Sequence, residues 1–204
     1  MFYKIGSPHG LPRDPFKSCI VPRPIGWIST ISPDGVVNLA PYSFFNGVAG
    51  EPPMVMFATN GKQHHGTKDS VANAEATGEF VCNMATWELR EKMNRTSAPV
   101  PPEEDEFALA SLETEPSKLV KPPRVKASPT HLECLYHTTL ELPCDIEGGR
   151  NAICVGRVIG VHIRDEFLTD GKVDIGLIVP LARLGYQDYT VAEKVVKITR
   201  PTKG

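Results

Sequence analysis

Short runs of β-branched and aromatic residues, separated by prolines and glycines, dominate the hydrophobic pattern of the chain. This pattern is typical of an all-β or α+β fold with many turns. Ser32-Pro33-Asp34-Gly35 matches a type I turn, which predicts a hairpin over 24–40. Its strands are expected at 25–31 and from 36–40 on, and the other expected strand-forming runs are 54–59, 80–84, 131–142, 152–164 and a C-terminal stretch at 191–199.

Helical patterns are short and few. Residues 69–77 are rich in Ala and Glu, and Gly78 follows them at the position that often takes a left-handed conformation after a helix. Thr86 can serve as the N-cap of a second helix over 87–94, and 107–112 is a third helix-like piece. Because no alternating βαβ units are visible, the sequence predicts a mainly β fold with short helices, built as an antiparallel barrel.

The length of 204 residues suits a single domain over 1–204. We expect residues 1–17 to form an N-terminal arm. Region 95–129 is irregular, with several prolines and an acidic cluster at 103–106. It is interpreted as an excursion over the barrel surface, a lid or a dimer arm, and not as a second domain.

Composition and charge exclude several classes of protein. The hydrophobic fraction of 41% is enough for a core, and the net charge of −2 comes without a basic stripe, so no nucleic-acid partner is expected. No apolar run approaches the length of a membrane span, and the N-terminus lacks the apolar segment of a signal peptide. We therefore expect a cytoplasmic protein without a membrane partner. The five cysteines, with no C-x-x-C pair, are interpreted as reduced structural thiols.

Familiar catalytic motifs are missing. The chain has no G-x-G-x-x-G, no G-x-x-x-x-G-K-[ST], no G-x-S-x-G and no H-E-x-x-H. His131, Glu133 and His137 share one face of a predicted strand, but with Cys134 on the other face they make a poor tetrahedral set, so no metal site is predicted. His64 and His65 can touch a ligand or lie in solvent.

Two segments have the chemistry of a ligand site. Residues 38–46 mix aromatic rings with small hydroxyl and amide groups, which suits a flat heteroaromatic ligand, although a hairpin with aromatic packing fits equally well. Lys68 and Ser70 stand at a predicted helix N-terminus, where free backbone N–H groups and the helix dipole attract phosphate. For Lys68 alone, a solvated surface lysine is the simpler interpretation.

The order of these segments carries a resemblance that no single segment does. R-P-x-x-W-x-S-T at 23–30, N-L-A-P-Y-S-F-F-N at 38–46, K-D-S-x-x-N at 68–73 and T-G-E-F-V-x-N at 77–83 resemble the flavin reductase-like family. That family includes flavoredoxins and the reductase partners of two-component monooxygenases. Pro-Pro at 52–53, Gly156-Arg157-Val158, the stretch 180–186 and Tyr189 extend the resemblance over about residues 18–190.

The resemblance implies a split β-barrel that binds FMN non-covalently at a homodimer interface and takes electrons from NADH, NADPH or a redox partner protein. Flavin or another small molecule would be the acceptor, and a monooxygenase is an expected partner. Since the flavin supplies the chemistry, no catalytic residue is named. The implied cofactor-binding residues are Trp27, Ser29 and Thr30 beside the flavin, Ala40, Pro41, Tyr42, Ser43, Phe44 and Asn46 around its isoalloxazine edge, Lys68, Asp69 and Ser70 at its phosphate, and Arg183 and Tyr186 from the C-terminal segment.

Two departures from the family pattern bear on function. Ser70 stands where many relatives carry Thr, a change that keeps the hydroxyl. Residues 151–156 lack the His that short-chain NAD(P)H:flavin reductases usually carry in a late strand. The complete motif set favours an FMN-dependent oxidoreductase, whereas the missing His favours a flavin-binding electron carrier or FMN-holding protein. A ligand-free β-barrel interaction protein is the remaining alternative.

Overall fold

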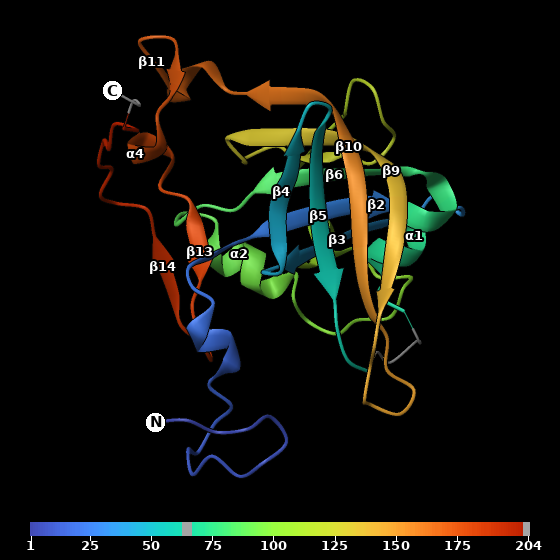
Figure 1. Ribbon diagram of the computed structural model, residues 1–204. Coiled ribbons are helices and arrows are strands. Elements are labelled where there is room, and N and C mark those ends of the chain that lie inside the picture. The colour runs from blue at the N-terminus through green and yellow to red at the C-terminus, as the bar shows by residue number, and fades with distance from the viewer. Residues whose placement is uncertain (63–66, 202–204) are drawn as a thin grey trace.

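The computed structural model describes residues 1–62 and 67–201, and its main feature is a seven-stranded antiparallel sheet (Figure 1). The strand order in this sheet is β3-β2-β6-β9-β10-β5-β4. Its strands are β2 (Gly26–Ile31), β3 (Val37–Tyr42), β4 (Phe45–Gly50), β5 (Pro53–Thr59), β6 (Glu79–Met84), β9 (Thr130–Leu142) and β10 (Asn151–Ile163).

The two edge strands of this sheet, β3 and β4, are consecutive in the chain and separated only by Ser43 and Phe44. A connection this short brings the edges together, so the sheet curls into a barrel. Register shifts in β10 at Val155/Gly156 and Val158/Gly160 supply local bends. A Cβ at Gly156 would overlap the ring of Phe80, so only glycine allows this close approach. The split barrel predicted from the sequence is confirmed.

Two hydrophobic clusters fill the two sides of the sheet. The inner cluster contains Ile28, Phe57 and Phe80, and it is closed by α1 (Asp69–Thr77) through Val71 and Ala74. The outer cluster contains Trp27, Leu39 and Leu181 together with side chains of α2 (Arg90–Arg95) and α3 (Glu106–Leu109). Strand β2 is consequently buried on both faces.

A smaller sheet stands beside the barrel, at the left in Figure 1. Its order is β1-β13-β14, and β1 leads directly into β2, so one segment joins both sheets. The bounds of these strands are β1 (Arg23–Pro24), β13 (Leu181–Arg183) and β14 (Tyr189–Val191). The remaining elements are η1 (Phe16–Cys19), β7 (Thr114–Glu115), β8 (Arg124–Val125), η2 (Asp165–Phe167), β11 (Leu168–Thr169), β12 (Lys172–Val173) and α4 (Ile175–Ile178).

Several local predictions are confirmed. The Gly35 N–H donates to the Ser32 carbonyl at 2.9 Å, which closes the expected turn. Helix α1 has the predicted bounds, and Gly78 follows it with φ of 78°. The residues before η1 extend away from the barrel (Figure 1), and their assignment as an N-terminal arm stays a prediction.

Other local predictions are wrong. Thr86 is not an N-cap: it forms an isolated bridge with Pro180, and the helix begins three residues after the expected start, at Arg90. The predicted helix over 107–112 ends at Leu109, because Ser111 takes a left-handed φ of 52°. The last strand ends at Val191, so the run 191–199 does not continue the sheet.

Region 95–129 packs tightly against the barrel. Phe107, Ala110 and Val125 are almost fully buried in the outer cluster. The Ser29 hydroxyl donates to the Pro123 carbonyl at 2.6 Å, and Asn83 Oδ1 accepts from the Val125 N–H at 2.8 Å. The excursion therefore covers the outer face of β2 and β6. Among the described residues, no helix combines the length and apolar character needed to cross a bilayer.

Candidate functional site

Three cavities meet at Pro41, near the end of β3. The large cavity has a volume of about 760 Å³, the inner pocket about 90 Å³ and the outer pocket about 200 Å³. The two pockets share Tyr42 and Lys68, and the large cavity shares Lys17 and Ser43 with the outer pocket. Since they have walls in common, the three form one continuous depression along residues 40–44, called the groove below.

The floor of the groove is the point where the barrel edge turns back. Pro41 pairs with Trp27 in the ladder, and proline is tolerated there because β3 is an edge strand. After Tyr42 the chain leaves β3, and the Phe44 carbonyl accepts from the Ala58 N–H at 2.8 Å. The local sequence thus exposes a bend of small and aromatic residues at the mouth of the barrel.

The N-terminus of α1 lies at the end of the groove that includes both pockets. Lys68 is the N-cap residue, with extended backbone angles, and Asp69 and Ser70 form the first turn. Lys68 lines both pockets, and Ser70 and Asp69 line the inner one. A nine-residue helix places partial positive charge at this end, so the arrangement suits an anionic group.

A buried polar network supports this end from below. Ser70 Oγ donates to Asn38 Oδ1 at 2.7 Å, and Asn38 Nδ2 donates to Glu106 Oε1 at 2.8 Å. The other Glu106 oxygen accepts from the Leu39 N–H at 2.9 Å. Burial raises the pKa of Glu106 to about 7, and the nearby carboxylates of Asp69 and Asp105 act in the same direction. The network fixes β3, α1 and α3 relative to one another.

Tyr42 forms the shared wall of the inner and outer pockets and is itself buried. Its ring lies 4.9 Å from that of Phe57, centroid to centroid. Burial raises the pKa of the Tyr42 phenol, so it stays protonated at neutral pH. The wall is therefore uncharged and rigid.

The large cavity has a different character, because basic and aromatic side chains gather around it. Arg90 lies 4.0 Å from the ring of Trp87, and Arg183 lies 4.4 Å from the ring of Tyr189, both measured from the guanidinium carbon to the ring centroid. Arg183 also donates to the Tyr186 carbonyl. These contacts hold each guanidinium close to a ring at the cavity wall.

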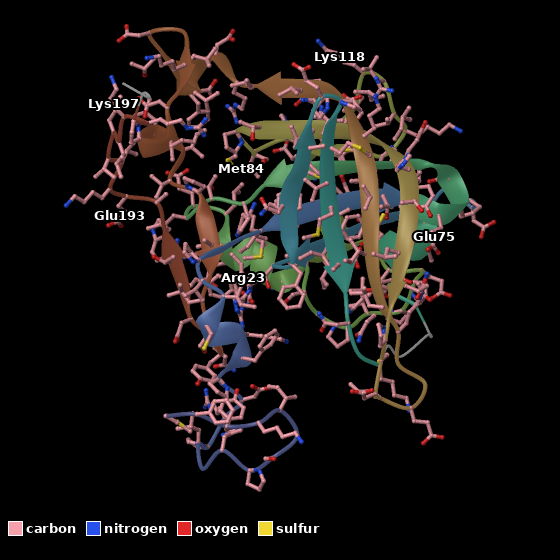
Figure 2. The ribbon with its side chains drawn as sticks, viewed as in Figure 1. Arg23, Glu75, Met84, Lys118, Glu193 and Lys197 are labelled. Carbon is pink, nitrogen blue, oxygen red and sulfur yellow. The ribbon has the colours of Figure 1, made fainter. Side chains whose placement is uncertain are left out.

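Arg23 connects the two sides of the groove. Its guanidinium donates to the carbonyls of Lys17, Ile20 and Leu184, and its Nε reaches Ser43 Oγ at 3.4 Å. Burial lowers the pKa of Arg23, and the neighbouring charge of Arg183 lowers it further. In Figure 2, Arg23 lies between the smaller sheet and the barrel. One side chain therefore ties η1, the smaller sheet and the floor together.

Most residues implied by the family resemblance come together in the groove, although they belong to separate segments of the chain. Four do not line it. Trp27 is fully buried and donates from Nε1 to Thr96 Oγ1 at 2.8 Å, while Ser29 and Thr30 bond to protein groups in the interior. Asn46 is exposed on β4 and accepts from the Gly47 N–H. The ten that line the groove are Ala40, Pro41, Tyr42, Ser43, Phe44, Lys68, Asp69, Ser70, Arg183 and Tyr186.

Sequence reasoning missed several residues that line the groove. Lys17, Trp87 and Arg90 lie outside the family motifs, and Glu106 lies in the irregular region. The spacing of Trp87 and Arg90, three residues apart near a helix start, is the signal that could have pointed to a shared face. Arg23 belongs to a quoted motif, but its role depends on contacts with residues far along the chain.

The histidines and cysteines in the described part of the chain line none of the three cavities. His131 is buried and bonds to the Val125 carbonyl, Glu133 is buried beside His162, and His137 is exposed. No group of three or more metal-binding side chains occurs in the described part of the chain. Cys82, Cys134 and Cys154 are buried free thiols. His64 and His65, which the sequence offered as ligand contacts, lie outside the described residues.

The chain matches the model of the flavin reductase-like domain over residues 18–188 and belongs to that family. It is 39% identical over 174 residues to an uncharacterized protein of Aquifex aeolicus, covering 85% of this chain and 86% of that protein. It is 31% identical to the Bacillus subtilis protein YwrF, with 93% of this chain and 95% of that protein covered.

Solved structures with a similar fold include proteins of related description. Nitrilotriacetate monooxygenase component B from Bacillus cereus is 27% identical, with a TM-score of 0.86 and coverage of 97% of this chain and 98% of that one. The 2-nitrobenzoate 2-nitroreductase NbaA of Pseudomonas fluorescens is 25% identical, with a TM-score of 0.80 and coverage of 92% and 89%. Flavoredoxin of Desulfovibrio vulgaris shares the fold, with a TM-score of 0.75, 16% identity and coverage of 97% of both chains. The resemblance drawn from the motifs is confirmed.

Proposed function

We propose that this protein is an FMN-dependent oxidoreductase that holds the flavin non-covalently in the groove. Electrons or hydride would pass through the flavin from NADH, NADPH or a protein donor to free flavin or a small acceptor. The observation that carries the proposal is the convergence of ten family-implied residues, from separate segments, on one groove. The membership of the chain in the flavin reductase-like family supports it.

Two features of the groove support FMN as its ligand. The phosphate would lie at the N-terminus of α1, beside Lys68 and Ser70, where positive charge and backbone N–H groups meet. The flat ring would lie along the bend from Pro41 to Phe44, at the mouth of the large cavity, whose volume of about 760 Å³ is in the range of small-molecule sites.

FMN, when bound, supplies the two-electron and one-electron chemistry. The protein's part is to hold and orient it. Lys68 would neutralise charge at the phosphate end. The Ser70–Asn38–Glu106 network would keep the floor fixed, since each member is already bonded to its neighbour. Arg23, donating to Lys17, Ile20 and Leu184, would hold the far wall in place.

A second function is favoured by one observation on β10. Residues Asn151 to Gly156 at its start carry no His, unlike short-chain NAD(P)H:flavin reductases. With that side chain missing, a flavoredoxin-like electron carrier or FMN-holding protein, without NAD(P)H turnover, is the alternative. Steady-state assays with NADH and NADPH separate the two functions.

A homodimer is part of the proposal. Strand β4 is an edge strand. Three apolar side chains are at least half exposed: Val48 on β4 (53%), Leu140 on β9 (55%) and Val161 on β10 (60%). Exposed apolar side chains on a sheet edge and face are typical of an interface between chains. Sedimentation velocity measures this directly: a species of one chain's mass at micromolar concentration would contradict it.

The first test is the visible absorption spectrum of the purified protein, followed by chromatography of what denaturation releases. A flavin spectrum with FMN in the supernatant supports the proposal. A colourless protein that takes up no added FMN would overturn it.

Reversing the charge of Lys68 tests the phosphate end. Lys68→Glu is expected to weaken FMN binding by about tenfold or more, because a like charge would face the phosphate. Lys118→Glu is the matched control: Lys118 is exposed on region 95–129 and lines none of the three cavities (Figure 2). Equal FMN affinity in both variants, measured by fluorescence titration, would show that α1 does not bind the phosphate.

A further inference from the structure

Positive charge around the large cavity is poorly compensated. Four basic side chains line it, and Glu91 is the one carboxylate among its lining residues. Arg90 approaches Glu91 at 3.5 Å, but the Glu91 side chain is 80% exposed. Within the described residues, no carboxylate lies within 4 Å of the other three, Lys17, Arg23 and Arg183.

The charges of Arg23 and Arg183 also oppose each other. The pKa of Arg23 is lowered first by its burial and then by Arg183. Two guanidinium groups that share a wall without a counter-ion raise the local potential, and an anion placed between them lowers it. The cavity therefore favours a negatively charged ligand.

Aromatic rings accompany these charges from two separate elements. Trp87 lies under Arg90 next to α2, and Tyr189 of β14 lies under Arg183 of β13. Trp87 is 49% exposed although it is large and apolar. Tyr186, also on the wall, has a left-handed φ of 54°, a conformation that costs a non-glycine residue energy and is concentrated at ligand sites.

We propose that the large cavity is the site for a small aromatic carboxylate, recognised by Arg90 and Arg183 through its carboxylate and by the accompanying rings through its aromatic face. A guanidinium matches a carboxylate with two parallel hydrogen bonds, and the rings offer stacking surface to a flat partner. Binding of the acid to the large cavity is independent of the proposed function. A reaction between the acid and a bound flavin rests on the proposed function.

The test is isothermal titration calorimetry of the full-length protein with benzoate and, separately, with NADH. Benzoate is expected to bind with a saturable isotherm that weakens as salt is raised. Arg90→Gln and Arg183→Gln are each expected to weaken benzoate binding by about tenfold. Arg95→Gln is the matched control, because it removes the same charge from α2 at a residue that does not line the cavity, and it should change binding less than about twofold.

Absence of saturable benzoate binding would overturn the proposal, also when the protein binds NADH. Equal benzoate affinity in all three variants would overturn it as well. Thermal unfolding checks that each variant is folded. The FMN content of the same samples separates the two proposals. Protein that neither carries FMN nor takes up added FMN, but binds benzoate through Arg90 and Arg183, supports the acid site and contradicts the proposed function. Flavin-loaded protein that ignores benzoate contradicts the acid site alone.

Discussion

The two sheets of the molecule meet at the groove, and their side chains there differ in kind. On the barrel side, Asn38, Ser70 and Glu106 are buried and bonded to one another. On the side of the smaller sheet, Arg183 and Tyr186 are partly exposed, and Arg183 has no carboxylate within 4 Å in the described residues. The named polar groups of the barrel side are bonded to one another, whereas Arg183 on the other side carries a charge with no carboxylate partner among the described residues.

Polar groups that are already bonded give a site its shape, because changing their partners would cost a buried hydrogen bond. Cationic groups at a half-open wall have N–H donors that are not used within the protein, so these donors can form hydrogen bonds with a ligand. The barrel side therefore fixes the shape of the groove, while the smaller sheet presents partly exposed cationic side chains to the large cavity.

The two tryptophans give the largest contrast. Trp27 belongs to the barrel side, with no exposed surface and a bond to Thr96. Trp27→Ala is expected to lower the free energy of unfolding by about 3–5 kcal/mol, because it leaves a cavity and removes the buried hydrogen bond to Thr96. Urea denaturation measures this loss. A small loss of stability accompanied by loss of FMN would instead mark Trp27 as a cofactor contact.

Arg23 is the link between the two sides, and its loss should separate them. Arg23→Gln is expected to cost about 1–3 kcal/mol, since the carbonyls of Lys17, Ile20 and Leu184 lose a buried donor. Hydrogen exchange should accelerate in η1 and β13 but not in β9. Arg164→Gln, at an exposed ion pair with Glu166, is the control. Uniform acceleration throughout the barrel would show that Arg23 supports the whole fold.

Glu106 makes the barrel side sensitive to pH. Its pKa is about 7 in the folded protein against an ordinary value of 4.5, so the folded state holds a proton that the unfolded state releases between these values. Stability from this group is therefore full below about pH 4.5 and is lost as pH rises toward 7. Buried His131, with a pKa lowered to about 4, acts in the opposite direction, adding stability as pH rises from 4 to 6.5.

Because these two titrations oppose each other, the wild-type protein should show a shallow dependence of stability on pH across this window. Glu106→Gln should remove one of them and leave stability rising with pH from about 4.5 to 6.5, by on the order of 1–3 kcal/mol. Thermal unfolding at half-unit pH intervals measures the slope. An unchanged slope in the variant would mean that Glu106 is ionised in the folded state at acid pH.

Trp87 should show the smallest effect on stability. It is half-exposed at the cavity wall, so Trp87→Ala is expected to change the free energy of unfolding by less than about 1 kcal/mol. The same change should weaken benzoate binding several-fold, because the stacking surface is lost. Calorimetry and urea denaturation on one sample compare the two quantities, and a large stability loss would place Trp87 with Trp27 in the core.

The sequence predicted the barrel side better than the other side, for reasons visible in single residues. The turn ending at Gly35 and the helix ending at Gly78 depend on local backbone chemistry, which short patterns report. Glu106 could not be found in this way, because its partner Asn38 is 68 positions distant. Nothing local marks one acidic residue of a cluster as the buried one.

Trp27 shows a second limit. Alternation along a strand tells which residues share a face, but β2 is buried on both faces because region 95–129 covers the outer one. A motif then marks Trp27, Ser29 and Thr30 as required without saying whether each touches a ligand or the core. The bond from Ser29 to Pro123, across 94 positions, decides this only in the folded chain.

The hydrogen bonds of Arg23 also bear on the order in which parts of the structure can form during synthesis, because one of them reaches Leu184, far along the chain. A chain synthesised as far as Ile163 contains all seven strands of the barrel, and its strands can pair. The large cavity still lacks a wall at that stage, because Leu184, 161 positions beyond Arg23, has not yet been made. Barrel closure can therefore precede the completion of the large cavity during synthesis, and a protein truncated before β13 would have the barrel strands without the cavity wall that carries Arg183.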